Sequence, residues 1–405
     1  MKKMYPALYA AFDPYPSPKG SATHIRYFSS ALFEQFGGGI LYSLGPADEP
    51  STFTEGSVRH ERFKQPVRNY LHRAEAYSSR LQQLLAEQKE LEIVHFRDIW
   101  SGLPLLAGDP RYVKVFEVNG LPSVELPYRY AQLPESTLTK LYQLEQDCLE
   151  RADHIVVPSA TIQSYLMGRN IPAGKITLIP NGALIPPAYE RPADAPEQYL
   201  IYFGALQPWQ GMDVLLKALP YLQDFDELKL MICAAHQRHF VKPYRKLAEK
   251  LGVADRIIWK FRLPQEKLWA YVQHARLSLA PLKEGPRNLD QGCCPLKILE
   301  SMACGTTVVA SDLPVVRELL CEGEDARLVK AERPAELARA VRILLDYPEE
   351  NAKLAHRAKI KVAAQFSWQK QQQILTQLYQ SLINNQKRHV QKLKKSLSDV
   401  SQADR

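Results

Sequence analysis

Residues 292–311 of the chain, GCCPLKILESMACGTTVVAS, predict a loop, a helix, a turn and a buried strand in succession. The helix is expected to begin near Pro295, because proline is favoured in the first helical turn. Gly305 is expected to end it, and the β-branched run that follows is typical of a strand. The unpaired N–H groups of the first turn attract anions, and Lys297 adds a cation there. Glu300 follows three residues later, so both side chains can face the same side of the helix.

Strands and helices alternate on both sides of this segment, in two series. The first series predicts strands at 4–12, 40–43, 93–96, 113–118, 155–158 and 176–179, and helices at 22–36, 71–89, 138–151 and 160–168. The second predicts strands at 199–203, 229–234, 257–259, 277–280 and 307–310, and helices at 212–221, 243–251, 268–274, 296–303 and 334–347. Strands separated by helices favour parallel sheets with helices on both faces. We therefore predict an α/β protein of two doubly wound, Rossmann-like domains that face a cleft, where ligands bind beyond the carboxyl ends of the strands.

A proline-rich stretch separates the two series. Residues 180–196 hold five prolines and no long apolar run, which is typical of an interdomain linker. The expected domains are residues 1–190 and 197–365. The last apolar-periodic stretch, 368–383, predicts a helix with no strand after it.

The composition is that of an ordinary folded protein. The 405 residues are 45% hydrophobic, 24% charged and 9% aromatic, which excludes a disordered, collagenous or coiled-coil chain. No run reaches eighteen apolar residues, and the first residues do not resemble a signal peptide. Six cysteines without a C-x-x-C pair indicate free thiols in a reducing compartment and no metal site. A cytoplasmic location is therefore expected.

The net charge of +8 comes from 52 basic and 44 acidic residues. Half of the excess lies in the tail, residues 386–405, where six basic side chains oppose two acidic ones. The rest of the chain lacks the basic clustering of a nucleic-acid-binding protein, so no nucleic-acid partner is expected. The tail predicts a solvated helical extension, with a peripheral contact to anionic lipid heads as the alternative.

Four short motifs follow one another along the chain: VPS at 157–159, PNG at 180–182, YFG at 202–204 with Gly211 after it, and the segment 292–311. Together they resemble the retaining glycosyltransferases of family 4, which have the GT-B fold, and the resemblance extends to about Leu382. It implies an N-terminal domain for the acceptor and a C-terminal domain for a nucleotide sugar. It also implies a helix at 366–385 that crosses back onto the N-terminal domain, retention of anomeric configuration, and no cofactor or metal.

The resemblance places donor-binding roles on several residues. Glu300 corresponds to the second glutamate of the family's E-x7-E motif, which holds the ribose hydroxyls, and a carboxylate can accept hydrogen bonds from both hydroxyls of a diol. Gly20 falls in a glycine-containing loop, where the backbone can approach a diphosphate at a helix N-terminus. Gly204, Gln210 and Pro295 lie within the matched donor segments. The alternatives are an exposed ion pair for Glu300 and a simple turn for Gly20.

Four polar positions depart from the family pattern. Ala205 and Gln210 stand where the family has an arginine and a lysine on the donor diphosphate, and Gly292 stands at the first glutamate of the E-x7-E motif. Asn119 replaces a histidine after the strand at 113–118. Asn119 and the neighbouring Glu117 are therefore the catalytic candidates, although Glu117 could simply pair with a surface cation.

Two explanations account for the lost cations. Either Arg287 and Lys297 have taken their place and neutralise the diphosphate, or donor chemistry is gone and the chain is a sugar-nucleotide-binding pseudoenzyme. We favour relocation, because simple decay would not require new cations close to the lost ones.

Acceptor-binding candidates come from the first series of elements. His24, on the first turn of a helix, either points at an acceptor or packs in the core. Arg97 follows a strand that ends at the cleft, where it either binds the acceptor or pairs with Asp98. Acidic residues of the helix at 138–151, Glu145 among them, are interpreted as a solvated face.

The residues together predict a retaining hexosyltransferase that moves a sugar from a nucleotide-sugar donor to a saccharide or lipid-linked acceptor, as in polysaccharide biosynthesis. Such an enzyme must neutralise the leaving diphosphate and hold the sugar near the attacking hydroxyl. The sequence does not identify the base, the sugar or the acceptor.

Overall fold

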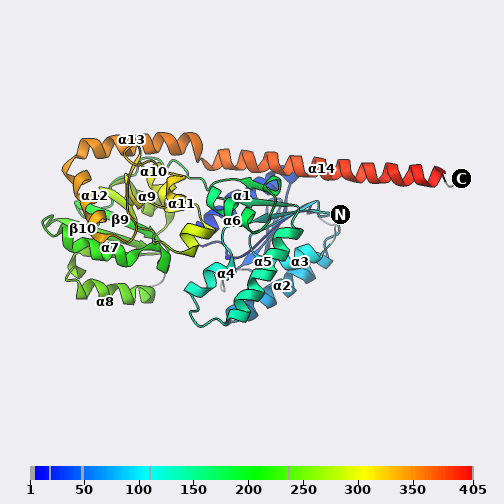
Figure 1. Cartoon of the computed structure of the whole chain (residues 1–405), viewed down its shortest axis with the longest axis horizontal. Coiled ribbons are helices and arrows are strands. Elements are labelled where there is room, and N and C mark those ends of the chain that lie inside the picture. Colours follow the sequence, from blue (N-terminus) through cyan, green and yellow to red (C-terminus); the bar gives the residue numbers. More distant parts are fainter. Residues whose placement is uncertain (1–4, 18–19, 47–49, 109–110, 236–237, 404–405) are drawn as a thin grey trace.

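The computed structural model describes residues 5–17, 20–46, 50–108, 111–235 and 238–403. Two sheets, each covered by helices, lie one after the other along the longest axis of the molecule (Figure 1). The predicted α/β architecture, with two doubly wound sheets, is confirmed.

The first sheet has eight strands in the order β3-β4-β2-β1-β5-β6-β7-β8. All neighbours are parallel except β3 and β4, which form an antiparallel hairpin at one edge. The central strands are buried on both faces, as expected of a parallel sheet covered by helices. The strands are β1 (Ala7–Pro14), β2 (Gly39–Leu44), β3 (Thr52–Glu55), β4 (Val58–Phe63), β5 (Ile93–Phe96), β6 (Val113–Glu117), β7 (His154–Val157) and β8 (Ile176–Leu178).

Six helices surround this sheet, and two hydrophobic clusters fill its two faces. The helices are α1 (Gly20–Phe36), α2 (Tyr70–Ala86), α3 (Ile99–Ala107), α4 (Pro122–Glu125), α5 (Glu135–Arg151) and α6 (Ala160–Gly168). The left-handed backbone of Gly37, whose φ is 74°, follows the end of α1 and is typical of a glycine C-cap.

The second sheet has six parallel strands in the order β11-β10-β9-β12-β13-β14. The strands are β9 (Gln198–Gly204), β10 (Leu228–Ala234), β11 (Ile257–Phe261), β12 (Leu277–Ala280), β13 (Val308–Ser311) and β14 (Ala326–Val329). The helices around it are α7 (Met212–Ala218), α8 (Lys242–Lys250), α9 (Gln265–Gln273), α10 (Leu296–Cys304), α11 (Pro314–Arg317), α12 (Pro334–Asp346) and α13 (Pro348–Gln365).

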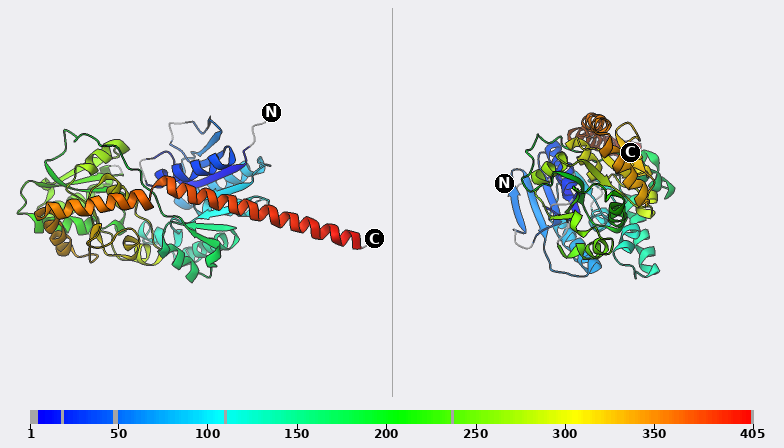
Figure 2. Two further views of the ribbon diagram at one scale, coloured as in Figure 1. Left: turned by 90° about the horizontal axis from the view of Figure 1, so that it is seen from above. Right: turned by 90° about the vertical axis from the view of Figure 1, so that its left-hand side faces the viewer.

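The last helix, α14 (Trp368–Ala403), returns from the second half and packs against α1 of the first, as the resemblance implies (Figures 1 and 2). Trp368 at its start stacks on Tyr27 of α1, with ring centroids 4.5 Å apart. The PNG motif explains how the chain can cross at this point. A Cβ on Gly182 would lie 2.7 Å from the backbone of Trp368, so only glycine leaves room for the crossing helix.

Several elements differ from the sequence-based expectations. The β3–β4 hairpin, the short helix α3, the strand β14 and the helix α13 were not predicted. Gly102 and Pro104 obscure the helical pattern of α3, but Asp98 caps it by accepting the N–H of Ser101. Pro104 lies inside the helix, past its first turn, so its missing N–H removes one backbone hydrogen bond, and the helix ends soon after it at Ala107.

The tail is not a separate segment but the continuation of α14. The helix runs without a break to Ala403 and projects beyond the body (Figure 2). Among the side chains that the structure describes, the last with a hydrogen bond to the body is Gln386, whose Nε2 donates to the carbonyl of Arg111 at 2.6 Å. The side chains of residue 390 and of residues 392–405, which include much of the basic charge, lie outside the described part.

We therefore expect a chain truncated after Gln386 to fold normally. The melting temperature should fall by less than about 2 °C, since no side chain that the structure describes as buried and apolar is removed. A chain truncated after Ser367 is the matched control. It loses buried Trp368, Leu375 and Tyr379, and should unfold at a much lower temperature or aggregate. Equal stability of the two truncations, measured by circular dichroism, would contradict this account of α14.

Candidate functional site

A cavity of about 530 Å³ lies between the two halves, at the carboxyl ends of the parallel strands. Nine of the eleven residues singled out in the sequence line it: Gly20, His24, Arg97 and Asn119 from the first half, and Gly204, Gln210, Arg287, Pro295 and Glu300 from the second. Glu117 and Lys297 lie just behind its walls. The spacing along the sequence therefore located the cavity, because strand ends of parallel sheets converge at one edge.

Two helices begin next to each other in the cavity wall. Gly20 is the first residue of α1 and Leu296 the first of α10. A Cβ on Gly20 would lie 2.7 Å from the side chain of Leu296, so glycine permits the two helix starts to meet. Each N-terminus carries partial positive charge and free N–H groups. Their meeting makes this wall suited to an anion.

Lys297 adds an amine that can carry a positive charge behind the same wall. Its side chain is 9% exposed, and its Nζ lies 3.8 Å above the ring of Tyr202. Nζ has no hydrogen-bond partner among the residues that the structure describes. Burial lowers the pKa of Lys297 to about 7, although nearby Cys293 and Glu300 oppose the shift. An unpaired buried ammonium is costly, so an anion bound nearby would be stabilised strongly.

Glu300 lies one helical turn after Lys297 and lines the cavity. Burial raises the pKa of its carboxyl to about 7, against the opposing effects of Gln265 and Lys297. The Nε2 of Gln265 donates to its Oε1 at 3.4 Å, which leaves the other oxygen open. Glu300 is therefore a carboxylate with room to accept hydrogen bonds from a ligand, and the alternative of an exposed ion pair does not apply.

The glycine of the YFG motif also faces the cavity. Gly204 has a φ of 108°, a value that favours glycine, and lies against the Lys297 side chain. Gln210, at one of the lost cationic positions, has its Oε1 buried without a partner in the described part of the chain.

Arg287 has ion-pair and hydrogen-bond partners within the protein, unlike Lys297, although both were expected to face a diphosphate. Its Nε lies 2.5 Å from a carboxylate oxygen of Glu125 in the first half, and its Nη2 donates to the carbonyl of Asn119 at 3.2 Å. Another of its N–H groups bonds to the carbonyl of Gly292. Arg287 thus ties the two halves together and holds the Asn119 loop, whereas Lys297 has no such partner.

The structure also explains why position 292 cannot hold a glutamate, which the family has there as the first residue of its E-x7-E motif. Its φ is 86°, and a Cβ there would lie 2.7 Å from the side chain of Thr161 at the start of α6. Glu318 reaches the same helix start: its carboxylate accepts the N–H groups of Ala160 at 2.7 Å and Thr161 at 3.0 Å. The space that a glutamate at 292 would need is therefore filled by an interdomain contact.

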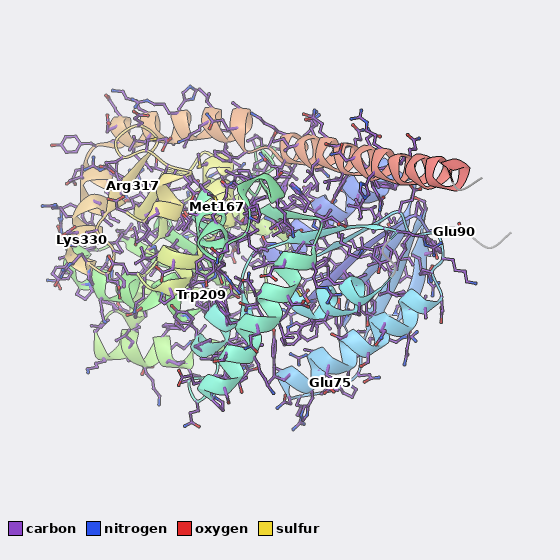
Figure 3. All side chains as sticks on the ribbon, turned by 45° about the vertical axis from the view of Figure 1, so that its right-hand side comes forward. Glu75, Glu90, Met167, Trp209, Arg317 and Lys330 are labelled. Atoms are coloured by element: carbon purple, nitrogen blue, oxygen red, sulfur yellow. The ribbon has the colours of Figure 1, made fainter. Side chains whose placement is uncertain are left out.

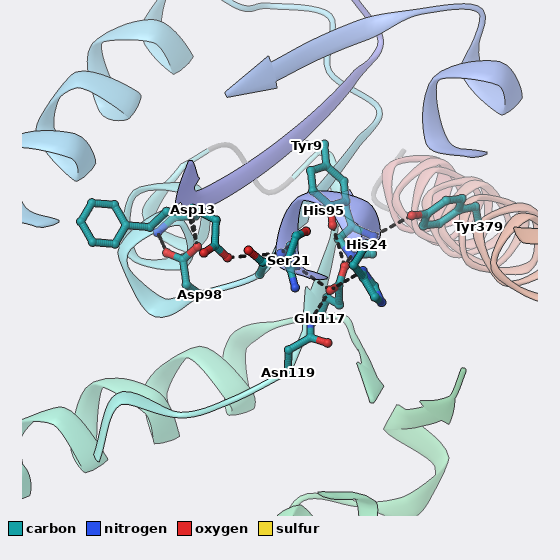
Figure 4. Close-up of polar contacts among 12 residues, drawn as sticks. Tyr9, Asp13, Ser21, His24, His95, Asp98, Glu117, Asn119 and Tyr379 are labelled. Carbon is teal, nitrogen blue, oxygen red and sulfur yellow. Dashed lines mark hydrogen bonds and ion pairs between the residues drawn. The ribbon is translucent and has the colours of Figure 1, made fainter. Parts of the chain in front are cut away.

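Glu117 is buried at the end of β6, with 1% of its surface exposed. Its Oε2 accepts hydrogen bonds from the hydroxyl of Tyr9 at 2.7 Å and from Nε2 of His95 at 3.0 Å (Figure 4). Its Oε1 accepts from Nε of Arg97 at 2.7 Å. Burial alone would raise the pKa of Glu117, but the His24 and Arg97 side chains beside it hold it well below its usual range. The expected surface ion pair is thus a buried one.

Two cavity-lining side chains share the same carboxylate. Asn119 donates its Nδ2 to Oε1 of Glu117, and Nδ1 of His24 lies 3.2 Å from that oxygen (Figure 4). His24 also packs on Phe28, with ring centroids 4.0 Å apart. Burial lowers the pKa of His24 to about 4, so its ring is neutral at pH 7. His24 therefore packs in the core and also lines the cavity, and its role toward an acceptor stays a prediction.

Two sequence-based interpretations are wrong. Arg97 does not pair with Asp98; it pairs with Glu117 and with Asp13 at 3.2 Å, because Asp98 is committed to the start of α3. Glu145 does not belong to a solvated face. It is fully buried and pairs with Arg169 at 2.9 Å.

Some residues of the site carried no recognisable sequence signal. Tyr9 and His95 sit in apolar strands, and Tyr379 lies 284 residues from the histidine that it contacts. Trp209, labelled in Figure 3, packs edge-on against Tyr128 of the first half at 5.1 Å. Trp209 thus packs against the first half and also lines the cavity.

Within the described ranges, no cluster of three or more histidine, cysteine or acidic side chains is arranged to hold a metal ion. The described helices also include none that is long and apolar enough to span a membrane.

Comparison with known families gives two adjacent matches. Residues 18–183 match the family model described as Glycosyltransferase Family 4, and residues 190–361 match the one described as Glycosyl transferases group 1. A D-inositol 3-phosphate glycosyltransferase from Corynebacterium glutamicum is 28% identical over 309 residues, which are 72% of this chain and 69% of that one. A similarly named protein from Thermobispora bispora is 28% identical over 255 residues, which are 57% of its length.

Solved structures share the fold at lower identity. Sucrose-phosphate synthase from Thermosynechococcus elongatus has a TM-score of 0.77 and 20% identity, over 94% of this chain and 100% of that one. HepE from Anabaena, in complex with UDP-glucose, has a TM-score of 0.71 and 16% identity, over 93% and 99%. Likeness at these identities extends to the fold and the GT-B arrangement of the two sheets.

The packing around Gly292 predicts that restoring the family's carboxylate will fail. Gly292→Glu forces a side chain into a left-handed backbone position against Thr161, and should destabilise the protein by about 1–3 kcal/mol. Gly174→Glu is the matched control, since it lies in open space without a positive φ. Thermal unfolding of both variants checks this. A Gly292→Glu protein as stable as the control would contradict the interdomain contact.

Proposed function

Because this chain belongs to glycosyltransferase family 4 and has the GT-B fold, we propose that it transfers a hexose from a nucleotide sugar to a saccharide acceptor with retention of configuration. The observation that carries the proposal is the pair formed by Lys297 and Glu300. An unpartnered buried ammonium and an accessible carboxylate stand one helical turn apart in a cavity between two Rossmann-like sheets. A nucleoside diphosphate presents the matching groups, phosphates and a ribose diol.

On the donor side, the diphosphate would lie at the meeting of the α1 and α10 starts, near Lys297. Charge-assisted hydrogen bonds to phosphate are shorter and stronger than neutral ones. Glu300 would accept the two ribose hydroxyls, since one of its oxygens is open. Gly204 faces the cavity with a φ of 108°, a backbone conformation that glycine adopts without strain.

On the acceptor side, aromatic rings from the first half line the cavity: Phe12, Tyr70 and Trp100. The indole N–H of Trp100 donates to the hydroxyl of Tyr70 at 3.1 Å, which fixes both rings. Asp13 lines the same wall and can accept hydroxyl hydrogen bonds. Relatives named for D-inositol 3-phosphate support a hydroxylated, sugar-like acceptor. We propose a saccharide, and a lipid-linked saccharide is the form that a membrane-surface enzyme would use.

The proposed reaction breaks the bond between the anomeric carbon and the diphosphate oxygen as the acceptor oxygen attacks from the same face. The acceptor proton passes to the departing phosphate oxygen, and Lys297 neutralises the charge that develops there. Glu117 is a poor nucleophile for a covalent intermediate, because its oxygens already accept hydrogen bonds from several donors. Asn119 and His24 would instead orient the sugar and the attacking hydroxyl. We expect turnover without added metal.

A donor screen tests this function. UDP-, GDP- and ADP-sugars are compared by thermal shift, and a true donor at 100 times its dissociation constant should add about 2.7 kcal/mol of stability. Glu300→Gln should weaken the binding of that donor by roughly 1–3 kcal/mol, since the charge that accepts both hydroxyls is lost. Folding stability should hardly change, because Glu300 faces the cavity.

A 2′,3′-dideoxy analogue of the donor is the control, and it should bind wild type and Glu300→Gln almost equally. Strong discrimination by the variant between the normal and dideoxy donors would show that Glu300 does not hold the ribose. Turnover with saccharide acceptors, followed by NMR of the product anomer, tests retention. Binding without any transfer would favour the pseudoenzyme over the enzyme.

The pKa values of Lys297 and Glu300, both near 7, predict opposite pH dependences for the binding of a nucleoside diphosphate and of a nucleoside. Burial lowers the pKa of Lys297 to about 7, so the cation is lost as the pH rises through 7, and binding of a nucleoside diphosphate should weaken. Burial raises the pKa of Glu300 to about 7, so the carboxylate forms over the same range, and binding of the nucleoside alone should strengthen. Titration calorimetry in two buffers at pH 7.5 measures the protons exchanged. We expect net uptake for the diphosphate relative to the nucleoside.

Lys297→Met separates the two effects. The variant should lose the extra proton uptake and at least about tenfold of the affinity for the diphosphate, while it keeps the affinity for the nucleoside. Equal losses for both ligands would show that Lys297 acts by maintaining the structure.

A further inference from the structure

Tyr379 has no part in the function proposed above, although it reaches the floor of the cavity from the far side. It lies on α14, is fully buried, and its hydroxyl is 2.6 Å from Nδ1 of His95 (Figure 4). His95 is also fully buried, and its Nε2 lies 3.0 Å from Oε2 of Glu117. Three polar side chains therefore connect the crossing helix to the carboxylate behind Asn119 and His24.

The directions of these hydrogen bonds follow from charge. Burial, together with the charge of Glu117, raises the pKa of Tyr379 well above its usual value, so the phenol keeps its proton. Glu117 is ionised and can only accept, so Nε2 of His95 carries the hydrogen. Nδ1 of His95 is then a lone pair, and the hydroxyl of Tyr379 donates to it. Glu117 therefore selects the Nε2–H tautomer of His95, and the hydroxyl of Tyr379 supplies the hydrogen bond that Nδ1 needs, which fixes the ring in this orientation.

The tautomer of His95 also determines how Glu117 is held. In the opposite tautomer, the Nε2 lone pair would face an ionised carboxylate, and repulsion would displace Glu117. Asn119 and His24 both lie against Oε1 of Glu117 and both line the cavity. A change in the tautomer of His95 would therefore shift Asn119 and His24, the two side chains nearest to the reacting groups.

Packing alone does not account for the hydroxyl. Tyr379 packs against Phe36 and His95, at centroid distances of 6.3 and 5.9 Å, and a phenylalanine would fill the same space. Burying a hydroxyl and an imidazole costs free energy unless they bond to each other, and pairs of this kind specify one arrangement of neighbouring groups.

We propose that Tyr379 is a positioning residue of the active site: α14, once docked, fixes His95 and, through Glu117, orients Asn119 and His24. The second half of the chain thus supplies the donor site and also a support for the acceptor side of the cleft. The proposal rests on the proposed function for the reaction that is served, whereas the coupling itself is a property of the protein without ligand.

The test uses NMR of the full-length protein with ¹⁵N-labelled histidine and asparagine side chains. In wild type, His95 should show the Nε2–H tautomer. Tyr379→Phe should change the ring signals of His95 and also those of His24 and the side-chain amide of Asn119, which Tyr379 does not touch. The signals are assigned from His24→Gln and Asn119→Ser.

Tyr27→Phe is the matched control. Tyr27 stacks on Trp368 at the same α1–α14 contact, but its side chain lies outside the Glu117 network. This variant should leave the signals of His24, His95 and Asn119 unchanged. His95→Leu breaks the connection in the middle and should move the signals of His24 and Asn119 even if Tyr379→Phe does not fold.

Kinetics complete the test. With a donor from the screen, Tyr379→Phe should lower kcat about tenfold and leave KM for the donor unchanged, because the donor-binding side chains Lys297 and Glu300 lie on the other half. Unchanged His24 and Asn119 signals in both Tyr379→Phe and His95→Leu would overturn the proposal and reduce Tyr379 to packing. A donor screen without any binder would instead contradict the proposed function. The NMR comparison would still decide whether Tyr379 positions His24 and Asn119.

Discussion

The buried carboxylate of Glu117 is the constraint on which the floor of the cleft depends. A charge with 1% of its surface exposed is stable only if its oxygens are fully hydrogen-bonded. The partners come from every central element of the first half: Tyr9 from β1, His24 from α1, His95 from β5, Arg97 after β5 and Asn119 after β6. Their side chains are thereby held in one arrangement, and three of them face the cavity.

Glycines define the contact between the two halves. Gly20 lets the start of α1 meet the start of α10, Gly182 makes room for the backbone of Trp368, and Gly292 fits against Thr161. Each lies in or near a motif that was noted first in the sequence. The contacts show why glycine is needed at these points: a Cβ at any of them would come within 3 Å of another element. The two halves pack closely at these points, against the side chains of Leu296 and Thr161 and the backbone of Trp368.

The loss of the family's usual cations has a structural counterpart. Arg287 was expected to replace one of them, but its guanidinium pairs with Glu125 and holds the Asn119 loop. Lys297, by contrast, has an Nζ without a hydrogen-bond partner in the part of the chain that the structure describes. The site therefore concentrates the positive charge at one lysine and two helix N-termini, and uses the arginine to join the two halves.

Much of the fold could be predicted from the sequence, because buried parallel strands and amphipathic helices leave strong local patterns. The two sheets, the crossing helix and nine residues of the cavity wall were located in this way. The α3 helix escaped, since Gly102 and Pro104 mask its pattern. The hydrogen-bond network of Glu117 was not predicted either. It joins Tyr9, His95 and Tyr379 across hundreds of residues, and such pairing depends on the tertiary fold. Glu145 was misread for the same reason, as its partner Arg169 lies on another element.

The central claim is that Lys297 and Glu300 together bind a nucleoside diphosphate. A crystal structure of the protein with UDP, GDP or ADP tests it most directly. The account predicts a phosphate oxygen within about 3 Å of Nζ of Lys297 and the ribose hydroxyls on the carboxylate of Glu300. Phosphates bound to Arg287 after its pair with Glu125 has opened, with Lys297 still unpartnered, would contradict it.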